Sequence, residues 1–170
     1  MKTLYVLRHA KSSWAAPELA DFDRPLNHRG ETTAPFMGEF MITHGFTPEV
    51  IVSSPAVRAR ETARLAKEGA RLTADIIHDE RIYEASPRTL QTVTSSIDDQ
   101  FESAMIVGHN PGMEGVVRLL TGRSEEMPTA ALAIIDLDID RWSEIDSGLG
   151  SLRRIVRPKE EMSKKSKKGK

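Results

Sequence analysis

Two arginines and two histidines follow short apolar runs of the sequence, at the places where strands are expected to end. Arg8 and His9 come directly after the first run, Arg58 follows the second by a few residues, and His109 comes directly after the third. A guanidinium group can bind phosphate oxygens through paired N–H groups, and a neutral imidazole can act as a nucleophile. These residue types therefore indicate phosphoryl transfer, provided that the fold gathers them at one place.

Arg58 is expected in the first turn of a helix. The dipeptide Ser54-Pro55 predicts that helix, with the serine as its N-cap and the proline as its first residue. A cation in a first turn opposes the helix dipole at a cost of about 0.3–1 kcal/mol, whereas a bound anion would contact both the guanidinium and the free helix N–H groups. An ion pair with Glu61, one turn later, is the simpler alternative. The other basic residues of the set favour an anion site.

His9 is the candidate nucleophile. The guanidinium groups of Arg8 and Arg58 would lower the pKa of its imidazole and would hold the phosphoryl oxygens during the transfer. His109 would donate a hydrogen bond to one of those oxygens. Each histidine also has a structural alternative: His9 could cap a strand, and His109 could serve only local hydrogen bonds.

A two-histidine metal site is a further alternative, but the two arginines would repel a divalent cation. We expect neither a metal nor an organic cofactor, because the arginines can supply the positive charge that a metal ion supplies in other phosphoryl-transfer enzymes. The chain has no Cys, so a thiolate nucleophile is not possible.

The elements that must position these residues alternate along the chain. Apolar runs predict strands over residues 3–7, 49–53, 104–108, 132–137 and 152–156. Helices are expected over residues 28–44, 56–70, 88–97 and 112–122. This alternation predicts an α/β fold, a three-layer α/β/α sandwich with a mainly parallel sheet and helices on both faces. The last strands have no long helix between them and are expected to form an antiparallel edge. Ligands of such sheets bind beyond the carboxyl ends of the strands, where the basic residues fall.

Composition excludes several classes of protein. The 170 residues are 39% hydrophobic and 29% charged, as expected for a soluble domain, and no apolar run is long enough to span a membrane. The first residues do not resemble a signal peptide, so we expect a cytoplasmic protein without a membrane partner. Five lysines follow Met162 and leave the rest of the chain acidic, which argues against a nucleic-acid partner. We expect one domain over residues 1–158 and a basic flexible tail over residues 159–170.

Three blocks of sequence together resemble the histidine phosphatase superfamily, which has the phosphoglycerate-mutase-like fold. The blocks are LRHAKSSW, SSPAVRARET and VGHNPGME, and the intervening DRPLNHRGE is similar to the segment that opens the first helix of the family. The resemblance implies a phosphatase that works through a phosphohistidine intermediate, with His9 as nucleophile and with Arg8, Arg58 and His109 as the residues that bind phosphate. It covers the chain up to about Pro158.

Within the superfamily, the sequence motifs HAKSSW and GHNPG are most similar to those of the bacterial phosphohistidine phosphatase branch. Members of that branch lack the large insertions that cap the pocket, which implies a phosphohistidine carried by another protein, such as a histidine phosphotransfer domain. A phosphatase or mutase of small phosphate esters remains an alternative, and a non-catalytic phosphate-binding module is another. Ala15 follows Trp14 where mutases usually have Asn, which disfavours the mutase.

The resemblance also implies an acidic proton donor in a variable loop, and Glu84 in RIYEAS is the nearest match. Its alternative is a solvated loop carboxylate. An imidazole that leaves a P–N bond is expected to need less help from an acid than an alkoxide does. A weak or absent acid would therefore itself favour phosphohistidine as the substrate.

For some polar residues near the first block, the sequence leaves two roles possible. Asp21, Asp23 and Arg24 are expected to form a local loop network, or else to shape the rim of the pocket. Lys11 and Ser12 could contact phosphate or simply lie at the surface.

Overall fold

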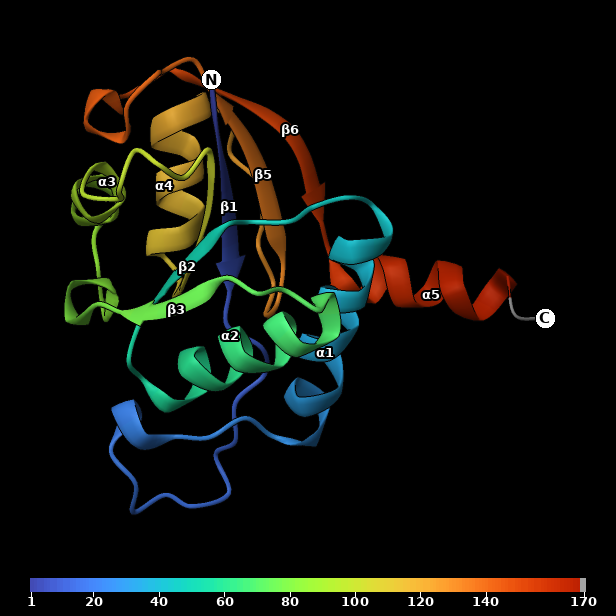
Figure 1. Ribbon diagram of the computed structural model, residues 1–170. Helices are drawn as coiled ribbons and strands as arrows, with labels where there is room; N and C mark the ends of the chain where they lie inside the picture. Colours follow the sequence, from blue (N-terminus) through green and yellow to red (C-terminus); the bar gives the residue numbers. More distant parts are fainter. Residues whose placement is uncertain (169–170) are drawn as a thin grey trace.

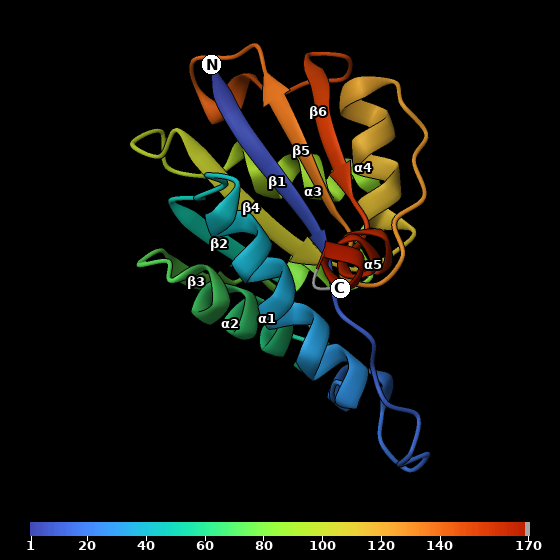
Figure 2. The ribbon, with the colours of Figure 1, turned by 90° about the vertical axis from the view of Figure 1, so that its right-hand side faces the viewer.

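The computed structural model describes residues 1–168, which form a six-stranded sheet with the order β3-β2-β4-β1-β5-β6 and helices on both faces (Figure 1). The strands are β1 (Lys2–Arg8), β2 (Val50–Ser53), β3 (Asp75–His78), β4 (Ser103–Gly108), β5 (Leu132–Leu137) and β6 (Gly150–Val156). The helices are α1 (His28–Thr43), α2 (Val57–Ala70), α3 (Pro87–Ser95), α4 (Gly112–Thr121) and α5 (Pro158–Lys168). Helices α1 and α2 cover one face of the sheet, and α3 and α4 cover the other (Figure 2). The predicted α/β/α sandwich is confirmed.

The direction and register of the strands align the carboxyl ends of β1, β2 and β4. β1, β2, β3 and β4 pair in parallel, whereas β5 and β6 are antiparallel additions at one edge, as expected. Arg8 lies opposite Gly108, and Ser53 lies opposite Val107. The carboxyl ends of β1, β2 and β4 therefore lie level with one another. The residues that follow these strands must meet at one edge of the sheet.

Alternate residues of β1 contribute to two separate cores, because successive side chains of a strand point to opposite faces. Leu4 and Val6 pack with α3 and α4, whereas Tyr5 and Leu7 pack with α1 and α2. Both faces of β1 are thus buried, which explains its continuous apolar run. Packing on both faces holds β1 in place. The position of the residues directly after it is therefore fixed as well.

Two elements were not predicted from the sequence. β3 has four residues at the edge of the sheet, and most of them are exposed, so no continuous apolar run marks it. α5 occupies most of the segment expected to be a flexible tail; residues 169–170 of that segment lie outside the described residues. Its first turn is acidic and its last turn is basic, which matches the helix dipole. Lys165 also pairs with Glu39 of α1 and lies over the ring of Phe36.

One helix begins later than predicted. α2 begins at Val57, and the hydroxyl of Ser54 accepts from the backbone N–H of Ala56 without capping the helix. The Ser54-Pro55 dipeptide therefore marks the turn after β2, rather than the first helical residues. α4 begins at Gly112, as predicted, with Pro111 at the N-cap position. Among residues 1–168, no helix is long and apolar enough to cross a membrane.

Candidate active site

His9, Arg58 and His109 meet at the carboxyl edge of the sheet. His9 follows β1, His109 follows β4, and Arg58 lies in the first turn of α2 after β2. The three residues are only 7%, 7% and 8% exposed, respectively. The imidazole rings of His9 and His109 have their centroids 5.2 Å apart. The structure therefore brings together side chains that lie as much as a hundred positions apart in the sequence.

The imidazole of His9 is fixed in one orientation. Its Nδ1 lies 2.7 Å from the carbonyl oxygen of Ala10, which can only accept, so Nδ1 carries the hydrogen and donates it. The neutral ring then has its lone pair on Nε2. The N–H of Ala10 donates to the hydroxyl of Thr62 in α2, which itself donates to the carbonyl oxygen of Arg58. This chain of hydrogen bonds joins the loop after β1 to the first turns of α2.

Burial keeps both histidines neutral at pH 7. It lowers the pKa of His9 from 6.5 to about 3, and the nearby charges of His109, Arg58 and Arg8 act in the same direction. Burial and the charge of Arg58 lower the pKa of His109 to about 4. We expected the guanidinium groups to lower the pKa of His9, and they do act in that direction. Burial is the larger cause, because the side chain is almost entirely removed from solvent.

These pKa values predict that neither ring titrates near pH 6.5. In NMR spectra, the ring signals of His9 and His109 should stay constant from pH 8 to about pH 5. The unfolded chain takes up these protons near pH 6.5 and the folded chain only near pH 3–4, so the unfolded state binds more protons in between. Stability should therefore fall as the pH falls through this window. A titration midpoint near 6.5 at His9 would contradict the buried, neutral imidazole.

Arg58 is held by Asp21 rather than by Glu61. Its guanidinium donates to the backbone oxygen and to the carboxylate of Asp21, at 2.7 and 3.0 Å, while Glu61 pairs with Arg64. The hydroxyl of Tyr83 donates to the same carboxylate at 2.6 Å. The hydrogen bonds from Tyr83 and Arg58 lower the pKa of Asp21 to about 2, and the bond to Asp21 raises the pKa of Tyr83 to about 12.

Part of the expected loop network exists, since Arg24 also donates to Asp21, whereas the side chain of Asp23 forms no hydrogen bond or ion pair with the described residues. The hydrogen bonds that join Asp21 to Arg58 and Tyr83 were not predicted. Asp21 is separated from Arg58 by 37 positions and from Tyr83 by 62, and no local pattern connects them. Asp21 thus belongs to both alternatives that the sequence left open, the loop network and the rim of the pocket.

Arg8 and His109 each present an unpaired buried nitrogen. Arg8 donates from one terminal nitrogen to the carbonyl oxygen of Met127, at 3.0 Å, while its Nε has no partner. His109 Nε2 lies 2.8 Å from the hydroxyl of Ser54, and its Nδ1 has no partner. Among the described residues these are the buried side-chain nitrogens or oxygens without a hydrogen bond. Buried polar groups are normally paired, so two unpaired nitrogens at one sheet edge fit a site that binds an acceptor.

A cleft of about 730 Å³ opens beside these residues and is lined by Asp21, Arg58, Glu84 and His109, among others. The structure thus places the predicted proton donor in the same cleft as Arg58 and His109. Glu84 is exposed, and its backbone has a φ of 54°, a left-handed conformation that is uncommon for a residue with a side chain. Within residues 1–168, no group of three or more His, Asp or Glu side chains could hold a metal ion.

The fold and the site together define a phosphatase with a histidine nucleophile. The family model of the histidine phosphatase superfamily (branch 1) matches residues 4–110, and the chain belongs to that superfamily. It is 32% identical to an uncharacterized protein of Mycobacterium leprae over 153 residues, which are 82% of this chain and 92% of that protein.

Two of the solved structures with the same fold carry the name SixA. A candidate phosphohistidine phosphatase SixA from Agrobacterium tumefaciens is 29% identical, with a TM-score of 0.80 over 92% of this chain and 98% of that one. A protein histidine phosphatase SixA complexed with tungstate is 20% identical, with a TM-score of 0.77 over 93% of this chain and 98% of that one. The second similarity shows the fold alone.

Proposed function

We propose that the protein removes the phosphoryl group from phosphohistidine on another protein, with His9 as the nucleophile. The observation that carries this proposal is the orientation of His9. Its Nδ1 is held by the carbonyl oxygen of Ala10, so that the lone pair of Nε2 is available beside buried Arg58 and His109. A neutral imidazole with one free nitrogen is the form that can attack phosphorus.

The first step transfers the phosphoryl group to the enzyme. Nε2 of His9 attacks phosphorus in line, the new N–P bond forms, and the bond to the leaving group breaks with its electron pair going to that group. Arg8 and Arg58 hold the equatorial oxygens and balance their charge. The hydroxyl of Ser54 can donate its hydrogen to Nε2 of His109 while its oxygen accepts from the N–H of Ala56. His109 would then carry its hydrogen on Nδ1, the unpaired nitrogen, and donate it to a phosphoryl oxygen.

In the second step, a water molecule attacks the phosphorus of the phosphohistidine enzyme, the N–P bond breaks, and Nε2 regains its lone pair. Phosphate leaves, and one proton of the water remains with phosphate or passes to solvent. Asp21 is unsuited to supply a proton in either step, because its pKa of about 2 keeps it ionised. Its role is to orient the guanidinium of Arg58.

Phosphohistidine is favoured as the substrate by the leaving group and by the shape of the site. The free ring nitrogen of a phosphohistidine can take its proton from solvent, so that neutral imidazole leaves, and the available acid, Glu84, is an exposed side chain at the cleft wall. The cleft is bordered by the short loops after β3 and β4 and by Asp21 of the longer loop after β1, an arrangement compatible with a side chain carried by another protein. The 29% identity to a SixA structure adds support. The cytoplasmic location stays a prediction from the sequence.

The substrate proposal is tested by competition. A phosphohistidine-containing phosphotransfer domain and a panel of sugar phosphates should be compared at matched concentration, pH and salt. We expect kcat/KM to be highest for the phosphohistidine protein. A higher kcat/KM for any small phosphate ester would reject this proposal in favour of the small-molecule phosphatase, and binding without turnover of any substrate would favour the non-catalytic module.

The role of Glu84 has its own test. Glu84→Gln should lower kcat for an alkyl phosphate by about 10²-fold, because an alkoxide leaving group needs a proton. It should leave kcat for phosphohistidine and p-nitrophenyl phosphate unchanged, since the phosphohistidine ring can take its proton from solvent and p-nitrophenolate leaves without one. Glu80→Gln serves as a matched control, because Glu80 is also exposed but does not line the cleft. Equal effects on all three substrates would exclude Glu84 as the proton donor.

A further inference from the structure

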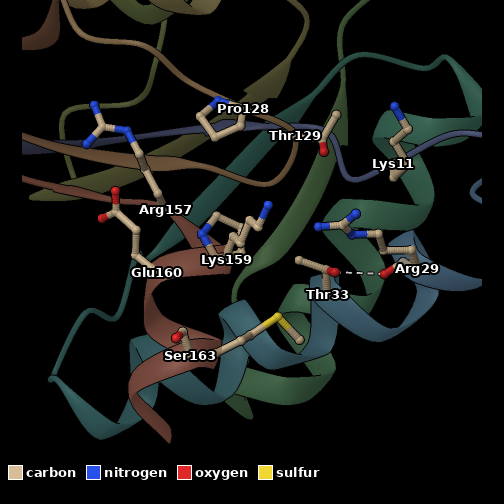
Figure 3. A pocket seen from close by; sticks show the side chains of 11 residues that line it. Lys11, Arg29, Thr33, Pro128, Thr129, Arg157, Lys159, Glu160 and Ser163 are labelled. Atoms are coloured by element: carbon tan, nitrogen blue, oxygen red, sulfur yellow. Dashed lines mark hydrogen bonds between the residues drawn. The ribbon is translucent and has the colours of Figure 1, made fainter. Parts of the chain in front are cut away.

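A second cleft, of about 490 Å³, is lined in part by Lys11, two positions after His9, and we call it the basic cleft. Its charged residues are Lys11, Arg29, Arg157, Lys159 and Glu160. Figure 3 shows Lys11 and Arg29 on one side of this cleft and Arg157 and Lys159 on the other, with Pro128 and Thr129 between them. The mechanism proposed above uses none of these residues.

The topology places the basic cleft at the same edge of the sheet as His9. β5 runs antiparallel to β1 and therefore begins where β1 ends, with Leu7 opposite Leu132. β6 runs antiparallel to β5 and ends at that edge, with Val156 opposite Leu132. The segments before β5 and after β6, which line the cleft, thus start from the edge that carries the active site.

The two clefts share the loop after β1. In the sheet order β1 lies between β4, whose end carries His109, and β5. The carbonyl oxygen of His9 accepts from the N–H of Ala130, the residue after Thr129 of the basic cleft. Lys11 follows His9 by two positions, and α1 packs tightly on its backbone, since a Cβ on Gly30 would lie 2.2 Å from the carbonyl oxygen of Lys11. The loop after β1 therefore carries His9 and contributes Asp21 to the first cleft and Lys11 to the second.

The charge of the basic cleft is unbalanced. Lys11, Arg29 and Lys159 are exposed, and within the part of the chain that the structure describes none of them forms an ion pair. Arg157 pairs with Glu125, and Glu160 is the one carboxylate in the lining. Three unpaired cations in a concave site on a chain of net charge −1 create a local positive potential that attracts acidic groups.

The residues that line the basic cleft suit a peptide ligand better than a bare anion. Pro128, Pro158 and Met162 contribute apolar surface to the cleft. A peptide can place its aliphatic groups on such surface while its carboxylates reach the cations at the rim. We propose that the basic cleft binds an acidic segment of the phosphorylated protein whose phosphohistidine enters the catalytic cleft. This inference rests on the proposed function, because it requires a protein substrate.

The test compares two phosphohistidine peptides, one with a flanking run of glutamates and one with glutamines in their place. Arg29→Gln combined with Lys159→Gln should lower kcat/KM for the glutamate peptide about tenfold through KM, which corresponds to about 1.4 kcal/mol. The same double variant should leave the glutamine peptide and p-nitrophenyl phosphate unchanged. Lys67→Gln combined with Arg118→Gln removes the same charge from the last turns of α2 and α4, and should leave all three substrates unchanged.

A binding measurement separates this inference from the proposed function. An unphosphorylated, fluorescent glutamate peptide should bind the wild type and lose about tenfold in affinity to the Arg29/Lys159 double variant, with added salt weakening the wild-type complex. Equal binding of the glutamate peptide to the two proteins would overturn the inference. An equal fall in kcat/KM for the two phosphopeptides in the double variant would overturn it as well. If neither phosphopeptide is hydrolysed while p-nitrophenyl phosphate is, the proposed substrate is wrong. The peptide-binding result then still decides whether the basic cleft binds an acidic peptide.

Inorganic phosphate provides a further check. If it displaces the peptide equally from the wild type and the double variant, the peptide binds in the catalytic cleft, and the inference is overturned.

Discussion

His9→Gln is expected to lower kcat for p-nitrophenyl phosphate and for phosphohistidine peptides by at least about 10⁴-fold, as the loss of a covalent nucleophile does in other enzymes. The glutamine side chain is polar and of similar reach, but it has no lone-pair nitrogen that can attack phosphorus. The loss should therefore fall on kcat, with substrate binding by Arg8 and Arg58 retained. Steady-state kinetics with both substrates measure this directly.

His28→Gln is the matched control, because His28 is an exposed histidine at the start of α1. It should keep wild-type kcat, and EDTA should have no effect on the wild type, since the arginines supply the positive charge in the proposed mechanism. Thermal unfolding of both variants shows whether the chain remains folded. Full activity in a folded His9→Gln protein, or full loss of wild-type activity with EDTA, would reject the assignment of the nucleophile.

Arg58→Gln is expected to cause the second-largest loss, about 10²–10³-fold in kcat, the effect typical of removing one group that stabilises transition-state charge. The substitution removes a buried guanidinium that lines the cleft, and it also leaves Asp21 with Tyr83 and Arg24 as partners. Arg58→Lys should recover only part of the activity, because an ammonium group keeps the charge but cannot make paired contacts to two oxygens. The measurement is kcat for the three proteins with p-nitrophenyl phosphate.

Arg64→Gln controls for the loss of an arginine from the same helix. Arg64 is exposed and pairs with Glu61 and Glu68, so its removal should leave kcat unchanged. Asp21→Asn should reduce activity less than Arg58→Gln does, since it disturbs the orientation of the guanidinium without removing it. If Arg58→Gln and Arg64→Gln lose the same small amount of activity, Arg58 does not bind the phosphoryl group.

The sheet and the basic part of the site could be predicted from the sequence because both depend on local patterns. A strand buried on two faces is a continuous apolar run, and the residues after parallel strands meet at one edge regardless of how far apart they lie in the chain. Arg8, His9 and His109 each follow such a run directly. Their meeting place therefore follows from strand direction alone.

The residues that orient the site could not be predicted, since their partners depend on tertiary structure. The loop before α1 brings Asp21 to Arg58, and the turn after β3 brings Tyr83 to Asp21. β3 itself has too little buried surface to leave a pattern. The lysine-rich end forms a helix for similar reasons, because its contacts with Glu39 and Phe36 of α1 are long-range.

The central claim is that Nε2 of His9 lies in line with a phosphoryl group whose oxygens are held by Arg8, Arg58 and His109. A crystal structure of the enzyme with vanadate, which mimics the transferred phosphoryl group, tests this claim most directly. We predict vanadium bonded to Nε2 of His9, with its oxygens within hydrogen-bond distance of both guanidinium groups and of Nδ1 of His109. Vanadate bound only in the basic cleft, or bonded to any atom other than Nε2 of His9, would contradict it.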